Sequence, residues 1–123
     1  MAASILPDYR QAARFGAERF SPVSIAETDK VKVVLTCFEA GQFIPVHAPG
    51  VDMALVVLEG EASVVAGETE SSVKPGAIVV VPAGEQRGVK ASTRMVAVHV
   101  VAPPPGESDH TAVQAGLQRG AWR

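Results

Sequence analysis

The chain has a single cysteine, Cys37, among its 123 residues. One cysteine cannot form a disulfide within the chain, which excludes a small secreted scaffold held together by disulfides. No apolar stretch approaches the roughly 20 residues that a membrane-spanning helix needs. The first residues, MAASILPDYRQ, have neither the basic start nor the long apolar core of a secretory signal. We therefore expect a cytoplasmic protein that has no membrane partner.

An excess of charge of one sign is also missing, because 11 basic and 13 acidic residues leave a formal net charge of −2. Proteins that bind nucleic acid or an anionic membrane electrostatically present a basic surface. The composition therefore provides no electrostatic case for either partner. With 47% hydrophobic residues, the chain has the composition of an ordinary globular domain, and its length suits one domain with a real core.

Short apolar segments separated by glycine and proline turns fill most of the chain, which is typical of an antiparallel barrel or sandwich rather than of βαβ units. We expect strands at residues 31–38, 43–47, 53–58, 62–66, 70–73, 77–81, 86–90 and 95–101. The segment 53–58 shows no alternation of polar and apolar residues, and the segment 77–81 is rich in valine and isoleucine. We expect both segments to be among the most buried, with Val56 and Val80 in the interior.

Two glycine-bounded blocks organise this pattern, GQFIPVHAPGVDMALVVLEG and GAIVVVPAGEQRG. Together they resemble the two sequence motifs of the cupin superfamily over roughly residues 30–103. The residues that fall on the cupin frame are Gly41, His47, Gly60, Gly76, Pro82 and Gly84. The resemblance implies an all-β fold, a cupin-type antiparallel β-barrel (a double-stranded β-helix or jelly roll). We expect residues 1–30 to form an N-terminal arm packed on the barrel, 31–103 the barrel, and 104–123 a short C-terminal helical tail.

The chain departs from the cupin pattern at the positions that hold metal. Metal-binding cupins supply three histidines and one glutamate from these motifs. Here Pro49 takes the second histidine position, Met53 the glutamate position and Arg87 the histidine position of the second motif. Only His47 remains of the four ligands. The resemblance therefore supports the cupin fold and argues against the usual metal-dependent activity.

Strand alternation adds two candidates to the site. If Arg94 points outwards, His99 points into the barrel, because side chains alternate along a strand. In residues 31–38 we place Cys37 inside by the same argument, and polar Lys32 and Thr36 outside. The expected ligand-binding residues are Cys37, His47, Met53, Arg87 and His99.

Two kinds of chemistry are open to this set. The guanidinium of Arg87 suits capture of a carboxylate or phosphate. Alternatively, Cys37, His47, Met53 and His99 could form a soft metal site, which would favour zinc or copper over iron or manganese. We expect no resident cofactor; if a metal binds, His47 and then His99 are its expected ligands.

The favoured function is binding of a small organic ligand, possibly acidic, inside the barrel without a metal. The alternative is a metal-dependent enzyme of the oxygenase or isomerase kind, with ligands from outside the motifs. A third reading is a regulatory or assembly protein that uses the barrel only as a scaffold, and fold alone does not choose among the three. The sequence identifies no catalytic residue. Because cupins commonly dimerise and the arm before Val31 offers an extra strand, we also expect a homodimer.

Overall fold

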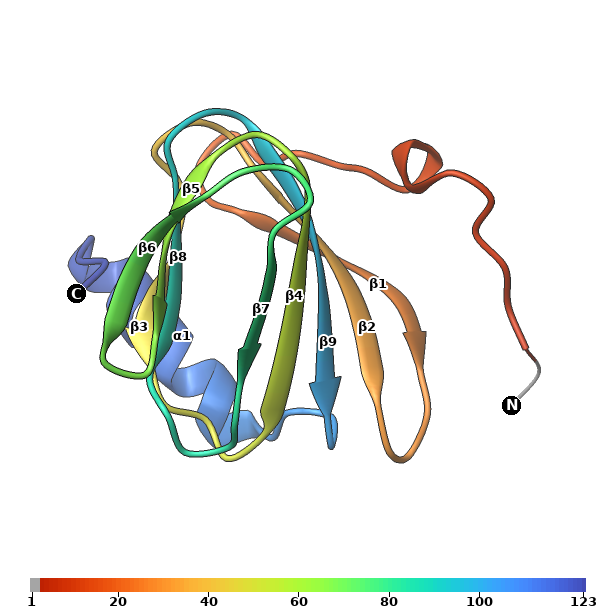
Figure 1. Ribbon diagram of the computed structural model, residues 1–123. Helices are drawn as coiled ribbons and strands as arrows, with labels where there is room; N and C mark the ends of the chain where they lie inside the picture. Colours follow the sequence, from red (N-terminus) through yellow and green to blue (C-terminus); the bar gives the residue numbers. More distant parts are fainter. Residues whose placement is uncertain (1–2) are drawn as a thin grey trace.

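The computed structural model describes residues 3–123, in which two antiparallel β-sheets face each other and a single helix packs against them (Figure 1). The first sheet has the strand order β1-β2-β9-β4-β7 and the second has the order β3-β8-β5-β6. The elements are η1 (Tyr9–Gln11), β1 (Ser21–Glu27), β2 (Lys32–Phe38), β3 (Phe43–His47), β4 (Asp52–Glu59), β5 (Ala62–Ala66), β6 (Thr69–Val73), β7 (Ile78–Val81), β8 (Arg87–Ala91), β9 (Met95–Ala102) and α1 (Glu107–Arg119). All the strands expected from the sequence are present, and the all-β prediction is confirmed.

Strand β1 was not among the barrel strands expected from the sequence, although the arm before Val31 was expected to offer an extra strand for dimerisation. It lies within residues 1–30 and pairs antiparallel with β2, with Pro22 opposite Thr36 and Ser24 opposite Val34. A proline lowers the strand signal, yet it is tolerated here because β1 is an edge strand that pairs on one side only. The N-terminal segment therefore extends the first sheet as well as packing against it.

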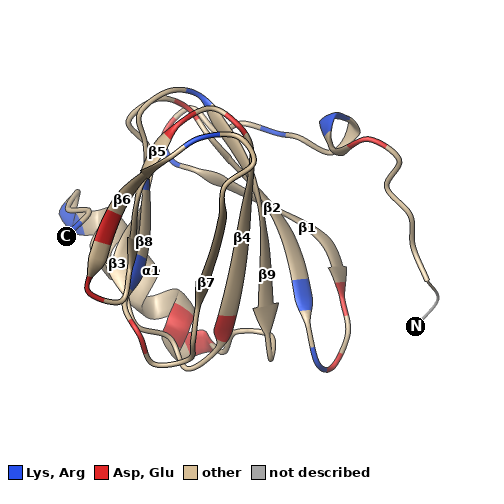
Figure 2. Cartoon of the chain, in the orientation of Figure 1, with Lys and Arg blue, Asp and Glu red and all other residues tan. Residues whose placement is uncertain are grey.

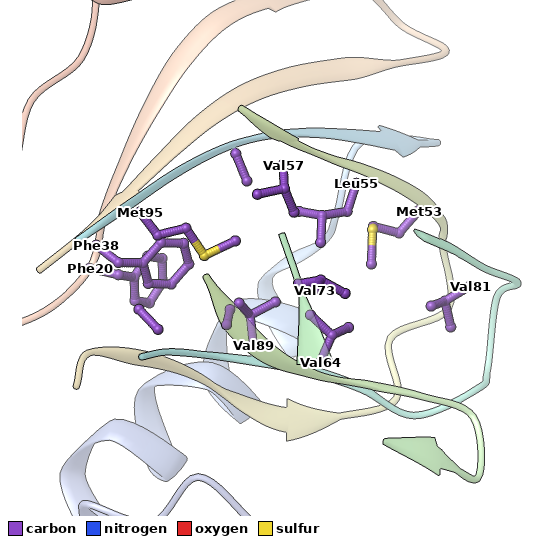
Figure 3. Close-up of a cluster of buried hydrophobic side chains, with 13 residues drawn as sticks. Phe20, Phe38, Met53, Leu55, Val57, Val64, Val73, Val81, Val89 and Met95 are labelled. Atoms are coloured by element: carbon purple, nitrogen blue, oxygen red, sulfur yellow. The ribbon is translucent and has the colours of Figure 1, made fainter. Parts of the chain in front are cut away.

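The hydrophobic core lies between the two sheets (Figure 3). From β4, the alternate residues Met53, Leu55 and Val57 point inwards and are buried. At one end of the core the rings of Phe20 and Phe38 stack with their centroids 5.8 Å apart. Val, Leu, Met and Phe fill much of the space between the sheets, and the cavity that remains is bordered by core residues that include Phe20, Met53 and Val89.

The outer face of β2 is covered by the N-terminal arm, which corrects our orientation of this strand. Leu35 and Cys37 are buried on that face against arm residues that include Tyr9 and Phe15. Thr36, expected outside, is instead buried and lines the cavity between the sheets. The expectation failed because both faces of β2 are covered, so hydrophobicity does not tell the inner face from the outer.

The outer face of β7 is not covered within the described chain. Ile78 and Val80 are 72% and 67% exposed, so the expectation that Val80 lies in the interior is wrong. Val56 lies on the same outer face of β4, opposite Ile78, and is partly buried. A run of valine and isoleucine therefore marks a strand here without marking burial on both faces.

The C-terminal tail forms α1 and is fastened to β3. Gly116 is buried against Pro45, and a Cβ added to Gly116 would lie 2.4 Å from the Cβ of Pro45. After the helix, the backbone N–H of Val46 donates to the carbonyl of Trp122 at 2.7 Å. These contacts hold α1 against the open edge of the second sheet. Within residues 3–123, no helix has the combination of length and apolar character that crossing a membrane requires.

Candidate functional site

A cavity of about 400 Å³ is lined by residues of both sheets and of α1. Its walls come from β1, β2, β4 and β9 of the first sheet, from β3 and β8 of the second, and from the start of the helix. This volume falls within the range of about 300–1,000 Å³ that small-molecule sites occupy. The cavity is largely apolar, with Ile44, Val89 and Val101 among its lining residues.

Four of the five residues expected at the site line this cavity. His47 ends β3, Met53 is the second residue of β4, Arg87 begins β8 and His99 lies within β9. Pro49 also lines the cavity, so the four positions that carry metal ligands in metal-binding cupins converge here as the motif frame implied.

Cys37 is the exception and does not belong to the site. It is a free, fully buried thiol on the opposite face of the first sheet, in a separate cluster with Leu35 and Val96. Burial raises the pKa of the Cys37 thiol, which disfavours the thiolate that a metal would need. The expected soft metal site therefore loses its strongest ligand.

Several cavity residues were missed by sequence reasoning. Thr36 was placed on the wrong face of β2, and the polar residues of α1 had no motif to mark them. The missed polar lining residues are Arg19, Ser24, Lys32, Thr36, Asp109, His110 and Gln114. Asp109 is the third residue of α1, where its Oδ2 accepts from the backbone N–H of Gly106 at 3.1 Å.

Arg87 is the unusual residue of the cavity, because it is a charged side chain that is only 5% exposed. Its Nη2 donates to the carbonyl of Pro82 at 2.9 Å. Its Nε and Nη1 are buried and have no hydrogen-bond partner among residues 3–123. Burial lowers the pKa of Arg87, which reflects the cost of holding a cation away from water. Buried donors and charges without partners are rare and expensive.

The carboxylates that act on Arg87 from nearby do not pair with it. Asp52, Asp109 and Glu85 oppose the lowering of its pKa through their charge. However, Oδ1 of Asp52 accepts from the backbone N–H of Ala83 at 2.8 Å, and Asp109 caps α1. No ion pair to Arg87 is formed anywhere in residues 3–123. Within the described residues, the Arg87 cation therefore lies in a largely apolar cavity without a carboxylate paired to it.

His99 and His47 are held neutral in the same cavity. Burial, with the charge of Arg87 as a second cause, lowers the pKa of His99 to about 4. The surface that His99 exposes lines the cavity. Burial also lowers the pKa of His47, although its hydrogen bond to the carbonyl of Pro45 opposes that shift. Because a carbonyl only accepts, Nδ1 of His47 donates in this 2.8 Å bond.

The depressed pKa of His99 predicts a loss of stability in mild acid. In the unfolded chain its pKa is about 6.5, so between that pH and about 4 the unfolded state binds more protons than the folded state. This contribution is complete above the unfolded pKa and is lost as the pH falls through the folded pKa. From pH 7 to about pH 5 we expect a loss of about 2 kcal/mol, measured by urea unfolding. His47 acts in the same direction.

The matched variants for this prediction are His99→Phe and His110→Asn. His99→Phe should flatten the change in unfolding free energy across this pH range. His110, an exposed residue of α1 at the border of the cavity, provides the comparison for a histidine that is not buried. A slope that is equally steep in both variants would show that other groups cause it.

The donor set does not fit the metal that the cupin fold commonly holds. Proline supplies no side-chain donor, methionine is a weak one and arginine is a fixed cation. Within residues 3–123 no group of three or more His, Cys, Asp or Glu side chains is placed to hold a metal ion. His47 and His99 remain as two nitrogen donors, and the Arg87 cation lines the same cavity. A site for a divalent metal commonly needs three or more protein ligands.

The two facing antiparallel sheets, with a cavity between them at the positions of the two motifs, define the class of protein as a double-stranded β-helix. Solved structures agree. A cupin from Desulfovibrio desulfuricans, described as RmlC-like, is 34% identical, with 85% of this chain and 98% of that chain covered and a TM-score of 0.70. TT1209 from Thermus thermophilus is 29% identical, with coverage of 80% and 96% and a TM-score of 0.75.

The chain belongs to the cupin superfamily. KdgF from a Halomonas species shares the fold with a TM-score of 0.75 over 87% of this chain and 99% of that chain, but only 16% of the residues are identical. No protein-family model matches the sequence, and no curated protein matches it. The relatives therefore establish the family and the fold, and the chemistry must be argued from the cavity.

Proposed function

We propose that this cupin binds a small organic acid in the cavity between its sheets, with Arg87 as the anion-binding residue and without a metal. The observation that carries the proposal is the buried guanidinium whose Nε and Nη1 lack partners. A carboxylate is the natural partner for such a group, because charge-assisted hydrogen bonds from arginine are among the strongest in proteins. The largely apolar walls suit an acid with an apolar body.

The direct test is to identify what the protein carries when it is purified without an affinity tag. Native mass spectrometry should show a bound small molecule, and the released compound should be an acid that rebinds the emptied protein in a calorimetric titration. A compound without an acidic group that binds stoichiometrically in the cavity would refute the proposal. So would a panel of aliphatic and aromatic carboxylates that all fail to bind the emptied protein.

The alternative, a metal-dependent enzyme, makes an opposite prediction for the same cavity. Since Pro49, Met53 and Arg87 line it with His47, the triple variant Pro49→His, Met53→Glu and Arg87→His should assemble a metal site. We expect stoichiometric Mn²⁺ binding by the folded triple variant and none by the wild type, measured by calorimetry. Binding of equal strength in both would favour the alternative and place its ligands outside the motifs.

We also propose that the protein is a homodimer formed through the outer face of β7, β4 and β9. Outward residues of this face, Ile78, Val80, Val56 and Val98, are apolar, and Ile78 and Val80 are exposed. Figure 2 shows no charged residue on β7 or β9. This neutral, apolar face has no pattern of charges that a different partner could match. We therefore propose that it packs against the same face of a second copy of the chain.

A single charge on this face should separate the subunits. Ile78→Glu would place a carboxylate against its own copy near a two-fold axis, which costs desolvation and repulsion. We expect light scattering to give a dimer mass for the wild type and a monomer mass for Ile78→Glu. Glu70→Gln on β6, in the other sheet, is the control and should remain dimeric. A monomeric wild type at working concentration would contradict the proposal.

A further inference from the structure

The hydroxyl of Thr36 determines which nitrogen of His99 carries the proton. Oγ1 of Thr36 lies 3.1 Å from the carbonyl oxygen of Ala97 and 2.6 Å from Nδ1 of His99. A carbonyl only accepts, so the single hydroxyl proton is used in the bond to Ala97. Both bonds form together only if Nδ1 of His99 carries a proton and donates it to Oγ1. The neutral ring then has an unprotonated Nε2 with a free lone pair.

This lone pair is available to a ligand. His99 lines the cavity, and the structure shows no hydrogen bond to its Nε2 from any residue in 3–123. The neutral form of His47 has the same arrangement, because its Nδ1 donates to the carbonyl of Pro45. The cavity therefore combines a buried cation, Arg87, with imidazole nitrogens that accept and do not donate, and the charged side chains of Arg19, Lys32 and Asp109 also border it. A ligand that fits it needs a carboxylate and, apart from it, a hydrogen-bond donor.

The charge of Arg87 selects the kind of donor. An ammonium group would be repelled by the guanidinium, which lies close enough for its charge to lower the pKa of His99. A hydroxyl group donates without carrying charge. We propose that the ligand is a hydroxy acid whose carboxylate binds Arg87 and whose hydroxyl donates to Nε2 of His99. This inference rests on the proposed function and goes further by naming the chemical class of the acid.

Thr36 acts in this proposal as a positioning residue, since it touches His99 and sets its tautomer. Replacing Thr36 with valine removes Oγ1, the atom that accepts the proton of Nδ1. The ring of His99 is then free to carry its proton on Nε2, and Nε2 would become a donor instead of an acceptor. Replacing Thr36 with serine keeps the hydroxyl. The pair Thr36→Val and Thr36→Ser therefore separates the hydrogen bond from the packing of the side chain.

The test compares matched acids by calorimetry on the wild-type protein and these variants. The probes are mandelate against phenylacetate, and 3-hydroxy-3-phenylpropanoate against 3-phenylpropanoate, so that the hydroxyl is tested at two positions. In at least one pair we expect the hydroxy acid to bind about 10-fold or more tightly, because leaving an acceptor unpaired is costly. Phenylglycine and O-methylmandelate should lose this advantage. The preference should vanish in Thr36→Val and His99→Phe and remain in Thr36→Ser.

The outcomes distinguish this inference from the function on which it rests. If both members of each pair bind equally and Arg87→Met abolishes both, acid binding stands and the hydroxy-acid inference is wrong. If none of the acids binds, both fail. A readout without ligand is the ¹⁵N chemical shifts of His99, which should show a protonated Nδ1 and an unprotonated Nε2. The opposite tautomer in the wild-type protein would overturn the inference even if Thr36→Val or His99→Phe failed to fold.

Discussion

Replacing Arg87 with methionine is expected to weaken binding of phenylacetate by about 100-fold or more while leaving the empty protein at least as stable. The affinity falls because the guanidinium is the only cation that we place against the ligand carboxylate, and loss of a buried charge partner costs about 2–5 kcal/mol. The empty protein does not suffer, because methionine removes a buried cation whose Nε and Nη1 have no partner. Apolar replacements of buried charged groups are often neutral or stabilising.

The control for this prediction lies on the same strand. Lys90 on β8 is exposed, so Lys90→Met removes a positive charge without touching the cavity. It should change neither the affinity for phenylacetate nor the unfolding free energy by more than about 0.5 kcal/mol. Calorimetry gives the affinity and urea unfolding gives the stability. A marked loss of stability in Arg87→Met would show that Arg87 serves the fold rather than a ligand.

The second large effect concerns the two faces of the first sheet. Val57 on β4 is 1% exposed within the core, whereas Val80 on β7 is 67% exposed on the outer face. Val57→Asp places an unpaired carboxylate among apolar side chains, and we expect it to cost about 4 kcal/mol or to prevent folding. Val80→Asp makes the same chemical change in solvent or at the proposed dimer interface.

We therefore expect Val80→Asp to keep the native circular dichroism spectrum and a cooperative unfolding transition in a subunit that no longer dimerises. Comparison of the two variants by circular dichroism and light scattering separates burial in the core from burial between subunits. If Val80→Asp unfolded the chain as severely as Val57→Asp, the outer face of β7 would be part of the subunit core, contrary to the structure.

Turn residues made the architecture predictable from the sequence. Gly41, Gly60, Gly76 and Gly84 all have positive φ, between 79° and 95°, which explains why the cupin frame needs glycine at these turns. At Gly60 the requirement is also steric, because an added Cβ would lie 2.0 Å from the carbonyl oxygen of Arg94. The spacing of such residues delimits the strands, so the strand ends were also predicted closely.

It was harder to predict which side chains of each strand point into the barrel, and the reason is the same for each error. Alternation of hydrophobic and polar residues identifies the inner face of a strand only when its other face is exposed to solvent. The N-terminal arm covers the outer face of β2, so Cys37 and Thr36 exchange the roles expected for them. At β7 the outer face is apolar but uncovered in the subunit. In β9, where Arg94 marked the outward side, the inward placement of His99 is confirmed.

The site was predictable only where the cupin motifs provided a spatial frame. His47, Met53 and Arg87 come from separate strands, and their convergence in one cavity was inferred from the family resemblance. The residues that α1 contributes, such as Asp109 and Gln114, depend on how the tail docks. That docking rests on the contact of Gly116 with Pro45 and on the backbone bond between Val46 and Trp122. No local pattern in the tail encodes such long-range contacts.

The most direct test of the account is a crystal structure of the wild-type protein grown with phenylacetate and without added metal. We expect the carboxylate within hydrogen-bonding distance of the Arg87 guanidinium, and the ring against the apolar walls formed by residues such as Ile44 and Val89. A cavity in which the acid lies away from Arg87, or in which a metal ion at full occupancy is bound to His47, would contradict the proposed function.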